Sequence, residues 1–309
     1  MVVVGAGFIG TEVARRLVGD GVDTTVLHRS PLAAGRAAMF VDSRCIQGSA
    51  ADRDVVVGAL DGASHVIWCA GGLLPAEADG DPAGSMDATY RPLATTLEVM
   101  RERGNLDLTY ISSGGAVYGN PPSLPVCEAS PAEPRTAYGI ACRSAELLVD
   151  RYREVFGVPS VVLRCGNVYG PGQPGNRSQG LVAAILHACR NGNVLPVFGD
   201  GGVVRDYVYI DDVVAVMREL VGRRDASPTF NVGSGIGTSV SEVIETAKRV
   251  TGIRVRTQYV AGRPGDVASV VLDIAKLRSL VALSFVSLDD GMRRTWDQFA
   301  SPALSPSAA

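Results

Sequence analysis

The chain has 309 residues, of which 20% are charged and 46% hydrophobic, so it can bury a large α/β core together with a smaller one. Its net charge of −3 gives no reason to expect nucleic acid or an anionic membrane as a partner, and no apolar run is long enough to span a bilayer. The six cysteines are scattered and form no CxxC pair, which predicts reduced thiols, no metal site and a cytoplasmic location.

Short β-branched runs alternate with helical patterns along the first half of the chain. The patterns predict strands at 2–4, 24–27, 65–69, 108–111, 160–164 and 206–210, and helices at 10–18, 94–103, 137–156 and 213–221. Such alternation is typical of an α/β fold with a doubly wound parallel sheet of the Rossmann type.

The same patterns suggest how the chain divides into domains. We expect an α/β domain of the Rossmann type over 1–168, with a return segment near 206–234. After Tyr169 the chain becomes rich in glycine and proline, and a smaller C-terminal α/β domain is expected over 169–300. The small polar residues over 301–309 predict a disordered tail.

A glycine-rich turn directly follows the first predicted strand. Gly5, Gly7 and Gly10 have the spacing GxGxxG, with Phe8 and Ile9 between the last two. Glycines there allow a tight turn, and backbone amides at the start of the next helix bind a pyrophosphate. The segment is therefore predicted to bind a dinucleotide, with a purely structural glycine turn as the alternative.

The residues after the second predicted strand bear on which dinucleotide binds. A site for NAD usually carries an acid there, about 20 residues after the glycines, to bind a ribose hydroxyl. His28, Arg29 and Ser30 occupy the region and include no acid. Because a guanidinium suits phosphate oxygens, Arg29 favours NADP over NAD; a solvated surface arginine is the alternative.

Several segments in order resemble the extended short-chain dehydrogenase/reductase family, the NAD-dependent epimerase/dehydratase group. The matching segments are 5–10, 112–119, 138–141, 163–172, 199–201 with 205–212, and 262–267. The resemblance covers nearly the whole chain. It implies a Rossmann domain, a small C-terminal domain that closes over a nucleotide-diphosphate sugar, and a homodimer that uses the helix from Ala137.

The resemblance also implies roles for individual residues. Tyr138 corresponds to the acid/base of a Tyr-x-x-x-Lys pattern, and Ser113 or Ser112 would assist it. Asn167, Arg205, Arg263 and Asp266 would bind the substrate, the arginines through its diphosphate. The implied cofactor-binding residues are Gly5, Gly7, Phe8, Ile9, Gly10, His28, Arg29, Ala70 and Cys142.

Three positions depart from the family pattern. The family's lysine is Cys142, its usual serine or threonine is Gly114, and the acid often found after Gly48 is Ser49. An ammonium about 6 Å from a phenol favours the phenolate by ~3 kcal/mol at an effective dielectric of about 20, or roughly two pK units. Without it, Tyr138 is a poorer base near neutrality, although it can still donate a proton.

Three functions follow from these residues. The loss of the lysine and the presence of Arg29 favour an NADPH-dependent ketoreductase that reduces a nucleotide-linked keto-hexose, with Tyr138 as proton donor. The first alternative is a nucleotide-sugar 4-epimerase with tightly bound NAD. The second is a non-catalytic protein that binds a dinucleotide or a nucleotide sugar, since fold alone does not establish catalysis.

Overall fold

The computed structural model describes residues 1–32, 34–175, 180–223, 228–262 and 267–300, so the predicted tail over 301–309 lies outside the described residues. Two compact units interleave along the chain. The first contains Met1–Ser112, Ala137–Arg164 and Met217–Phe230, and the second contains Ser113–Thr136, Cys165–Val216 and the chain from Asn231 onward. The first boundary between the units therefore lies after Ser112, whereas the sequence patterns suggested a domain boundary after 168.

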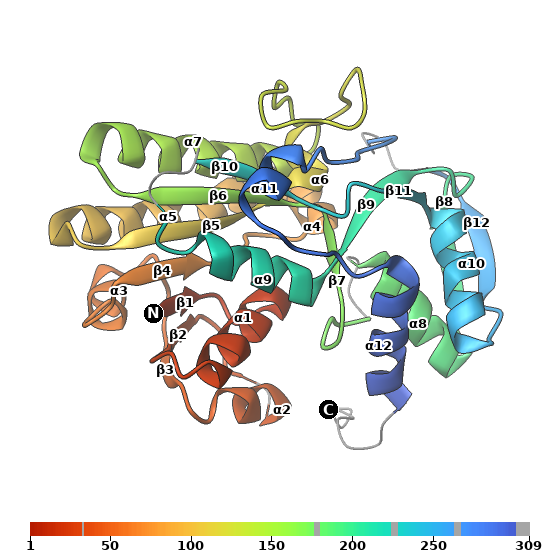
Figure 1. The fold of residues 1–309 in the computed structure, drawn as a ribbon, viewed down its shortest axis with the longest axis horizontal. Coiled ribbons are helices and arrows are strands. Elements are labelled where there is room, and N and C mark those ends of the chain that lie inside the picture. Colours follow the sequence, from red (N-terminus) through yellow and green to blue (C-terminus); the bar gives the residue numbers. More distant parts are fainter. Residues whose placement is uncertain (33, 176–179, 224–227, 263–266, 301–309) are drawn as a thin grey trace. The chain divides into compact units, whose positions relative to one another are not determined.

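A seven-stranded sheet forms the centre of the first unit, in the order β10-β6-β5-β4-β1-β2-β3 (Figure 1). β1 pairs in parallel with β2 and β4, β2 pairs in parallel with β3, and β4 does so with β5. The strand order reverses at β1, as the predicted doubly wound Rossmann-type fold requires. The strands are β1 (Val2–Val4), β2 (Thr25–His28), β3 (Arg44–Gln47), β4 (His65–Trp68), β5 (Asp107–Ser113), β6 (Ser160–Cys165) and β10 (Thr229–Val232).

Helices cover the sheet on its two faces. Successive side chains of a strand point to opposite faces, yet all three residues of β1 and all four of β4 are buried. The helices that follow these strands are α1 (Phe8–Gly19), α2 (Ala34–Ala37), η1 (Ala38–Phe40), α3 (Arg53–Ala59), α4 (Pro75–Gly80), α5 (Pro82–Arg103) and α7 (Ala137–Phe156). α5 and α7 lie side by side (Figure 1), and α4 packs against them.

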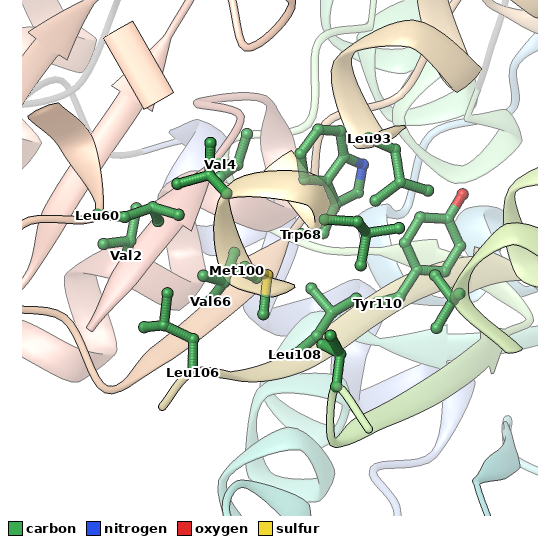
Figure 2. Packing of buried hydrophobic residues seen from close by; sticks show 14 of the residues in the cluster. Val2, Val4, Leu60, Val66, Trp68, Leu93, Met100, Leu106, Leu108 and Tyr110 are labelled. Atoms are coloured by element: carbon green, nitrogen blue, oxygen red, sulfur yellow. The ribbon is translucent and has the colours of Figure 1, made fainter. Parts of the chain in front are cut away.

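The core of the first unit lies between one face of the sheet and helices α3, α5 and α7. Figure 2 shows Trp68 of β4 lying beside Leu93 of α5, with Tyr110 of β5 close by. Val2 and Val4 point into this cluster, whereas Val3, between them, is buried without belonging to it. The period-2 alternation of the strands therefore places the three valines of β1 on the two faces.

The second unit contains two small sheets. β7 (Asn167–Tyr169) pairs in parallel with β9 (Val204–Tyr209), which pairs antiparallel with β11 (Gly237–Ser239). β8 (Val194–Phe198) pairs in parallel with β12 (Arg256–Val260). The helices are α6 (Gly114–Val117), α8 (Leu181–Asn191), α9 (Ile210–Leu220, which runs into the first unit), α10 (Val240–Thr251), α11 (Ala275–Leu280) and α12 (Leu288–Ala300). Among the described helices, none combines the length and the hydropathy that a bilayer crossing needs.

Candidate active site

The glycine turn between β1 and α1 depends on close backbone contacts. Gly5 has φ 103°, and its amide donates to the carbonyl oxygen of Leu27 at 2.8 Å. A Cβ on Gly5 would lie 2.6 Å from the amide nitrogen of Ala70, two residues after the end of β4. Only glycine fits this backbone conformation and this approach, so the turn is held at the carboxyl end of the sheet, where ligands of such folds bind.

The start of α1 is suited to an anion. A Cβ on Gly10 would lie 1.9 Å from the carbonyl oxygen of Gly5, so the loop and the helix can approach only because residue 10 is glycine. A Cβ on Gly7, by contrast, would meet no atom within 4 Å. The first turn of α1, with Phe8 and Ile9, carries no acid and no side-chain cap. Its amides and the helix dipole therefore fit the pyrophosphate of a dinucleotide.

The residues after β2 are those that the sequence patterns predict to contact an adenosine ribose. His28 ends β2, is buried, and has Nδ1 3.0 Å from the carbonyl oxygen of Ser30. Arg29 is exposed. Arg36, on α2, was not predicted: its Nη1 donates to the carbonyl oxygen of Ala6 in the glycine turn at 3.0 Å. This bond joins residues 30 positions apart, so no local sequence pattern could have indicated it.

Tyr138 lies in the first turn of α7, in the same unit as the glycine turn. The amide of Ala137 donates to Oδ1 of Asp79, on α4, at 3.1 Å, which fixes the beginning of the helix. The Tyr138 side chain is half-buried, and Cys142 follows one turn further along the helix. The two side chains therefore lie on one face of α7, as their spacing of four residues dictates.

Cys142, at the position of the family's lysine, is an uncharged group in this site. It is 8% exposed, and burial raises the pKa of its thiol to about 12, although Tyr138 acts on that pKa in the opposite direction. Tyr110 lies close to this pair from β5; burial, followed by the nearby Cys142, raises the pKa of its phenol. Cys142 therefore cannot supply the positive charge that the lysine gives to a cofactor or a phenol.

One turn beyond Cys142, Glu146 is at the centre of a buried ionic cluster. Its carboxylate accepts from Nε and Nη2 of Arg164, on β6, at 3.0 and 2.8 Å, and from Nη1 of Arg143 at 2.9 Å. Ser112, a predicted catalytic residue, donates to Glu146 Oε1 at 2.6 Å and is buried. This cluster fastens α7 to β5 and β6. Glu146 was not predicted from the sequence, although its position four residues after Cys142 puts it on the same helix face.

Three predicted residues lie in the second unit. Ser113 is the N-cap residue of α6 but makes no side-chain cap hydrogen bond, so its hydroxyl has no capping role. Asn167 lies on β7, and its Oδ1 would be 3.1 Å from a Cβ at position 115. Gly115 has no Cβ and therefore leaves room for this side chain. Arg205, on β9, donates through Nη1 to the carbonyl oxygens of Val204 and Ala268 at 2.8 and 3.4 Å. Arg263 and Asp266 lie outside the described residues.

The parallel sheet, the glycine turn at the reversal of strand order and the acid-free start of α1 define a dinucleotide-binding protein of the Rossmann class. Comparison with known proteins gives the family. The chain belongs to the NAD dependent epimerase/dehydratase family, whose model matches residues 1–233. This confirms the family that the sequence motifs predicted.

The relatives of the chain include nucleotide-sugar epimerases. It is 30% identical to a putative UDP-glucose 4-epimerase of Methanocaldococcus jannaschii, over 94% of each chain. Its fold matches the UDP-glucose 4-epimerase of Thermotoga maritima, solved with UDP-glucose, with a TM-score of 0.90, 29% identity and coverage of 97% of this chain and 99% of that one. The UDP-glucose 4-epimerase of Thermus thermophilus, solved with NAD, gives a TM-score of 0.90, 28% identity and coverage of 98% and 100%.

Proposed function

We propose that the protein is a 4-epimerase of a nucleotide-diphosphate sugar that keeps a nicotinamide dinucleotide bound through each turnover. The main support is that the chain matches UDP-glucose 4-epimerases over nearly its full length. The glycine turn and Tyr138 also lie in the same unit. The ketoreductase that the sequence favoured takes second place, because the relatives named above are epimerases.

Each step of this reaction requires a particular role from residues of the chain. When bound, the nicotinamide supplies the acceptor and later the donor of a hydride. Tyr138 takes the proton of the sugar hydroxyl as the carbonyl forms, and returns it to the oxygen afterwards. Ser113 would hydrogen-bond the same oxygen. Asn167, Arg205, Arg263 and Asp266 would hold the sugar and its diphosphate, as the family resemblance implies.

The test follows the sugar without any added reductant. The purified protein is incubated with UDP-glucose, UDP-galactose and other nucleotide sugars, and the epimers are separated by chromatography. We expect conversion of at least one sugar, and loss of conversion in Tyr138→Phe, because the phenol transfers the proton. A Tyr138→Phe variant with full turnover would contradict the assignment, and binding of the dinucleotide without any turnover would support the non-catalytic alternative.

A ketoreductase is the second candidate, and Cys142 favours it. An uncharged thiol beside Tyr138 gives the phenol little help as a base but leaves it able to protonate an alkoxide. The discriminating substrate is a nucleotide-linked 4-keto-hexose supplied with NADPH. Loss of NADPH absorbance with this substrate, together with no epimerisation of the saturated sugars, would favour reduction over epimerisation.

We propose that NADP binds at least as tightly as NAD. Arg29 is exposed directly after β2, and the sequence from 24 to 41 contains two arginines and no acid that could bind the ribose hydroxyls in the manner of an NAD site. Arg36 adds a second guanidinium at the glycine turn. The neighbour from Thermus thermophilus was solved with NAD, so a direct comparison of the two dissociation constants is the test.

We propose a homodimer that uses the outer surface of α5 and α7. Ile140 and Leu147 on α7 are 47% and 53% exposed, and Tyr90 on α5 is 41% exposed, although α5 and α7 pack against each other. Large apolar side chains gathered on neighbouring helices are typical of a protein interface. Light scattering should give the mass of a dimer, and Leu147→Asp should give that of a monomer.

A further inference from the structure

Asp206, on β9, is a buried carboxylate that hydrogen-bond donors surround. It is 2% exposed. Its Oδ1 accepts from the amide and from the hydroxyl of Ser234, both at 2.7 Å. Its Oδ2 accepts from the amides of Gly235 and Leu272 at 3.1 and 3.2 Å. Because all four partner groups donate, the carboxyl group accepts every bond only when it is ionised. Burial raises the pKa of this carboxyl, and the bonds act in the opposite direction.

Two glycines allow the chain to close around Asp206. A Cβ on Gly233 would lie 2.5 Å from Oδ2 of Asp206, and a Cβ on Gly166 would lie 2.7 Å from its backbone carbonyl oxygen. Neither approach leaves room for a larger residue. Asp206 therefore joins three segments that are distant in the sequence, namely the start of β7, the turn between β10 and β11, and the chain at Leu272.

The sheet of β11, β9 and β7 places two predicted substrate-binding residues on the face opposite to this carboxylate. Asn167 of β7 lies opposite Tyr207 in the parallel pair, and Gly237 of β11 lies opposite Asp206 in the antiparallel pair. Successive side chains of a strand alternate between the two faces. Arg205 and Tyr207 therefore share one face with Asn167, whereas Asp206 points to the other. All of these residues belong to the second unit.

The guanidinium of Arg205 depends on the same backbone. Its Nη1 donates to the carbonyl oxygens of Val204 and Ala268 at 2.8 and 3.4 Å. The amide of Val204 also donates to the carbonyl oxygen of Ala268, at 3.0 Å. Leu272, which bonds to Asp206, follows four residues later on the same segment. The carboxylate of Asp206 thus helps to hold both carbonyl groups that fix the direction of the Arg205 side chain.

We infer that Asp206 is a positioning residue for the binding of a nucleotide sugar, because its carboxylate fixes the backbone that carries Arg205 and Asn167. This inference rests on the proposed function, in which these two side chains hold the sugar and its diphosphate. Asp206 itself does not contact the substrate, since it points to the opposite face of the sheet. A guanidinium binds phosphate oxygens well only when its direction is fixed, so loss of the carboxylate weakens binding.

The experiment measures the binding of nucleoside diphosphates as well as turnover. UDP, dTDP and GDP are titrated by calorimetry into the wild type and Asp206→Asn. The asparagine keeps the size of the side chain, but its amino group would face two donors and accept neither bond. We expect the Kd of the diphosphate and the KM of the sugar to rise about tenfold, with kcat changed less than about twofold. The Kd of the dinucleotide should stay unchanged, because the glycine turn belongs to the other unit.

Two additional variants guard against a general loss of structure. Asp290, on α12, is an exposed carboxylate in the same unit that also accepts a serine hydroxyl at 2.7 Å, and Asp290→Asn should leave Kd and KM unchanged. Ser234→Ala removes one donor but keeps the carboxylate, and should raise the Kd of the diphosphate about threefold. If thermal unfolding shows that Asp206→Asn does not fold, Ser234→Ala decides, and a wild-type Kd in this variant would refute the inference.

A double-mutant cycle shows whether Asp206 acts through Arg205. In an Arg205→Ala background, Asp206→Asn should weaken the binding of the diphosphate by less than about twofold, because the side chain that it positions is already absent. An equal loss of binding in the two backgrounds would show that Asp206 does not act through the arginine, and the positioning role would be wrong.

The outcomes for this inference and for the proposed function are distinguishable. A wild type that binds a nucleoside diphosphate but epimerises no sugar contradicts the proposed function, while the titrations still test Asp206. A folded Asp206→Asn variant with the wild-type Kd and KM overturns the positioning role, whatever reaction the wild type catalyses. A wild type that binds none of the three diphosphates and converts no sugar overturns both.

Discussion

The buried carboxylate of Glu146 gives the sharpest prediction for stability. The change is Glu146→Gln, which keeps the size of the side chain and one acceptor oxygen but removes the charge. The native carboxylate is 1% exposed and faces Arg164, which is 5% exposed, so the substitution leaves a guanidinium buried without its counter-ion. Removing one partner of such a pair costs about 3–5 kcal/mol of the free energy of unfolding.

Two additional changes separate this effect from a general cost of substitution. Glu245→Gln alters an ion pair with Lys248 in which the side chains are 62% and 48% exposed, and it should cost less than about 1 kcal/mol. The double variant Glu146→Leu with Arg164→Met removes both charges and should be less destabilised than Glu146→Gln alone.

The measurement is unfolding in urea near neutral pH, followed by circular dichroism, for all four proteins. We expect the midpoint of Glu146→Gln to fall well below those of the wild type and Glu245→Gln, with the double variant between them. If Glu146→Gln costs no more than Glu245→Gln, the buried cluster does not hold α7 on the sheet, and the explanation given for the position of Tyr138 is wrong.

Three further predictions concern the cofactor and pH. Gly10→Ala should abolish dinucleotide binding in a titration, because its Cβ would strike the Gly5 carbonyl, whereas Gly19→Ala, with open space, should bind as the wild type does. Burial lowers the pKa of His65 to about 4, so as the pH falls below 6.5 the unfolded state binds a proton before the folded state does. The free energy of unfolding should therefore be roughly 2 kcal/mol lower at about pH 5 than at pH 7. This pH dependence should be absent in His65→Gln. Arg29→Ser should weaken NADP more than NAD; equal losses in their dissociation constants would exclude a 2′-phosphate contact.

Local signals in the sequence predicted the central fold and much of the candidate site. The glycine spacing predicted the turn around Gly5, because that geometry depends on residues a few positions apart. The helix at 137–156 has the predicted bounds, and its period of 3.6 residues places Tyr138 and Cys142 on one face.

Contacts between distant segments could not be predicted in this way. β3, Arg44–Gln47, was missed because it is an edge strand with mostly exposed residues and lacks the alternation that marks a half-buried strand. The bond from Ser112 to Glu146 joins positions 34 apart, and the partner of Arg36 is 30 positions away. A single sequence carries no periodic signal at such separations.

The interleaving of the two units affects how the protein can be divided for experiments. A fragment that stops at 168 would lack Met217–Phe230 and the whole of β10, leaving the backbone groups of β6 open along one edge of the sheet. Exposed edges of this kind attract other strands and promote aggregation. Separate expression of a cofactor-binding half would need a circularly rearranged or spliced gene that restores the missing strand.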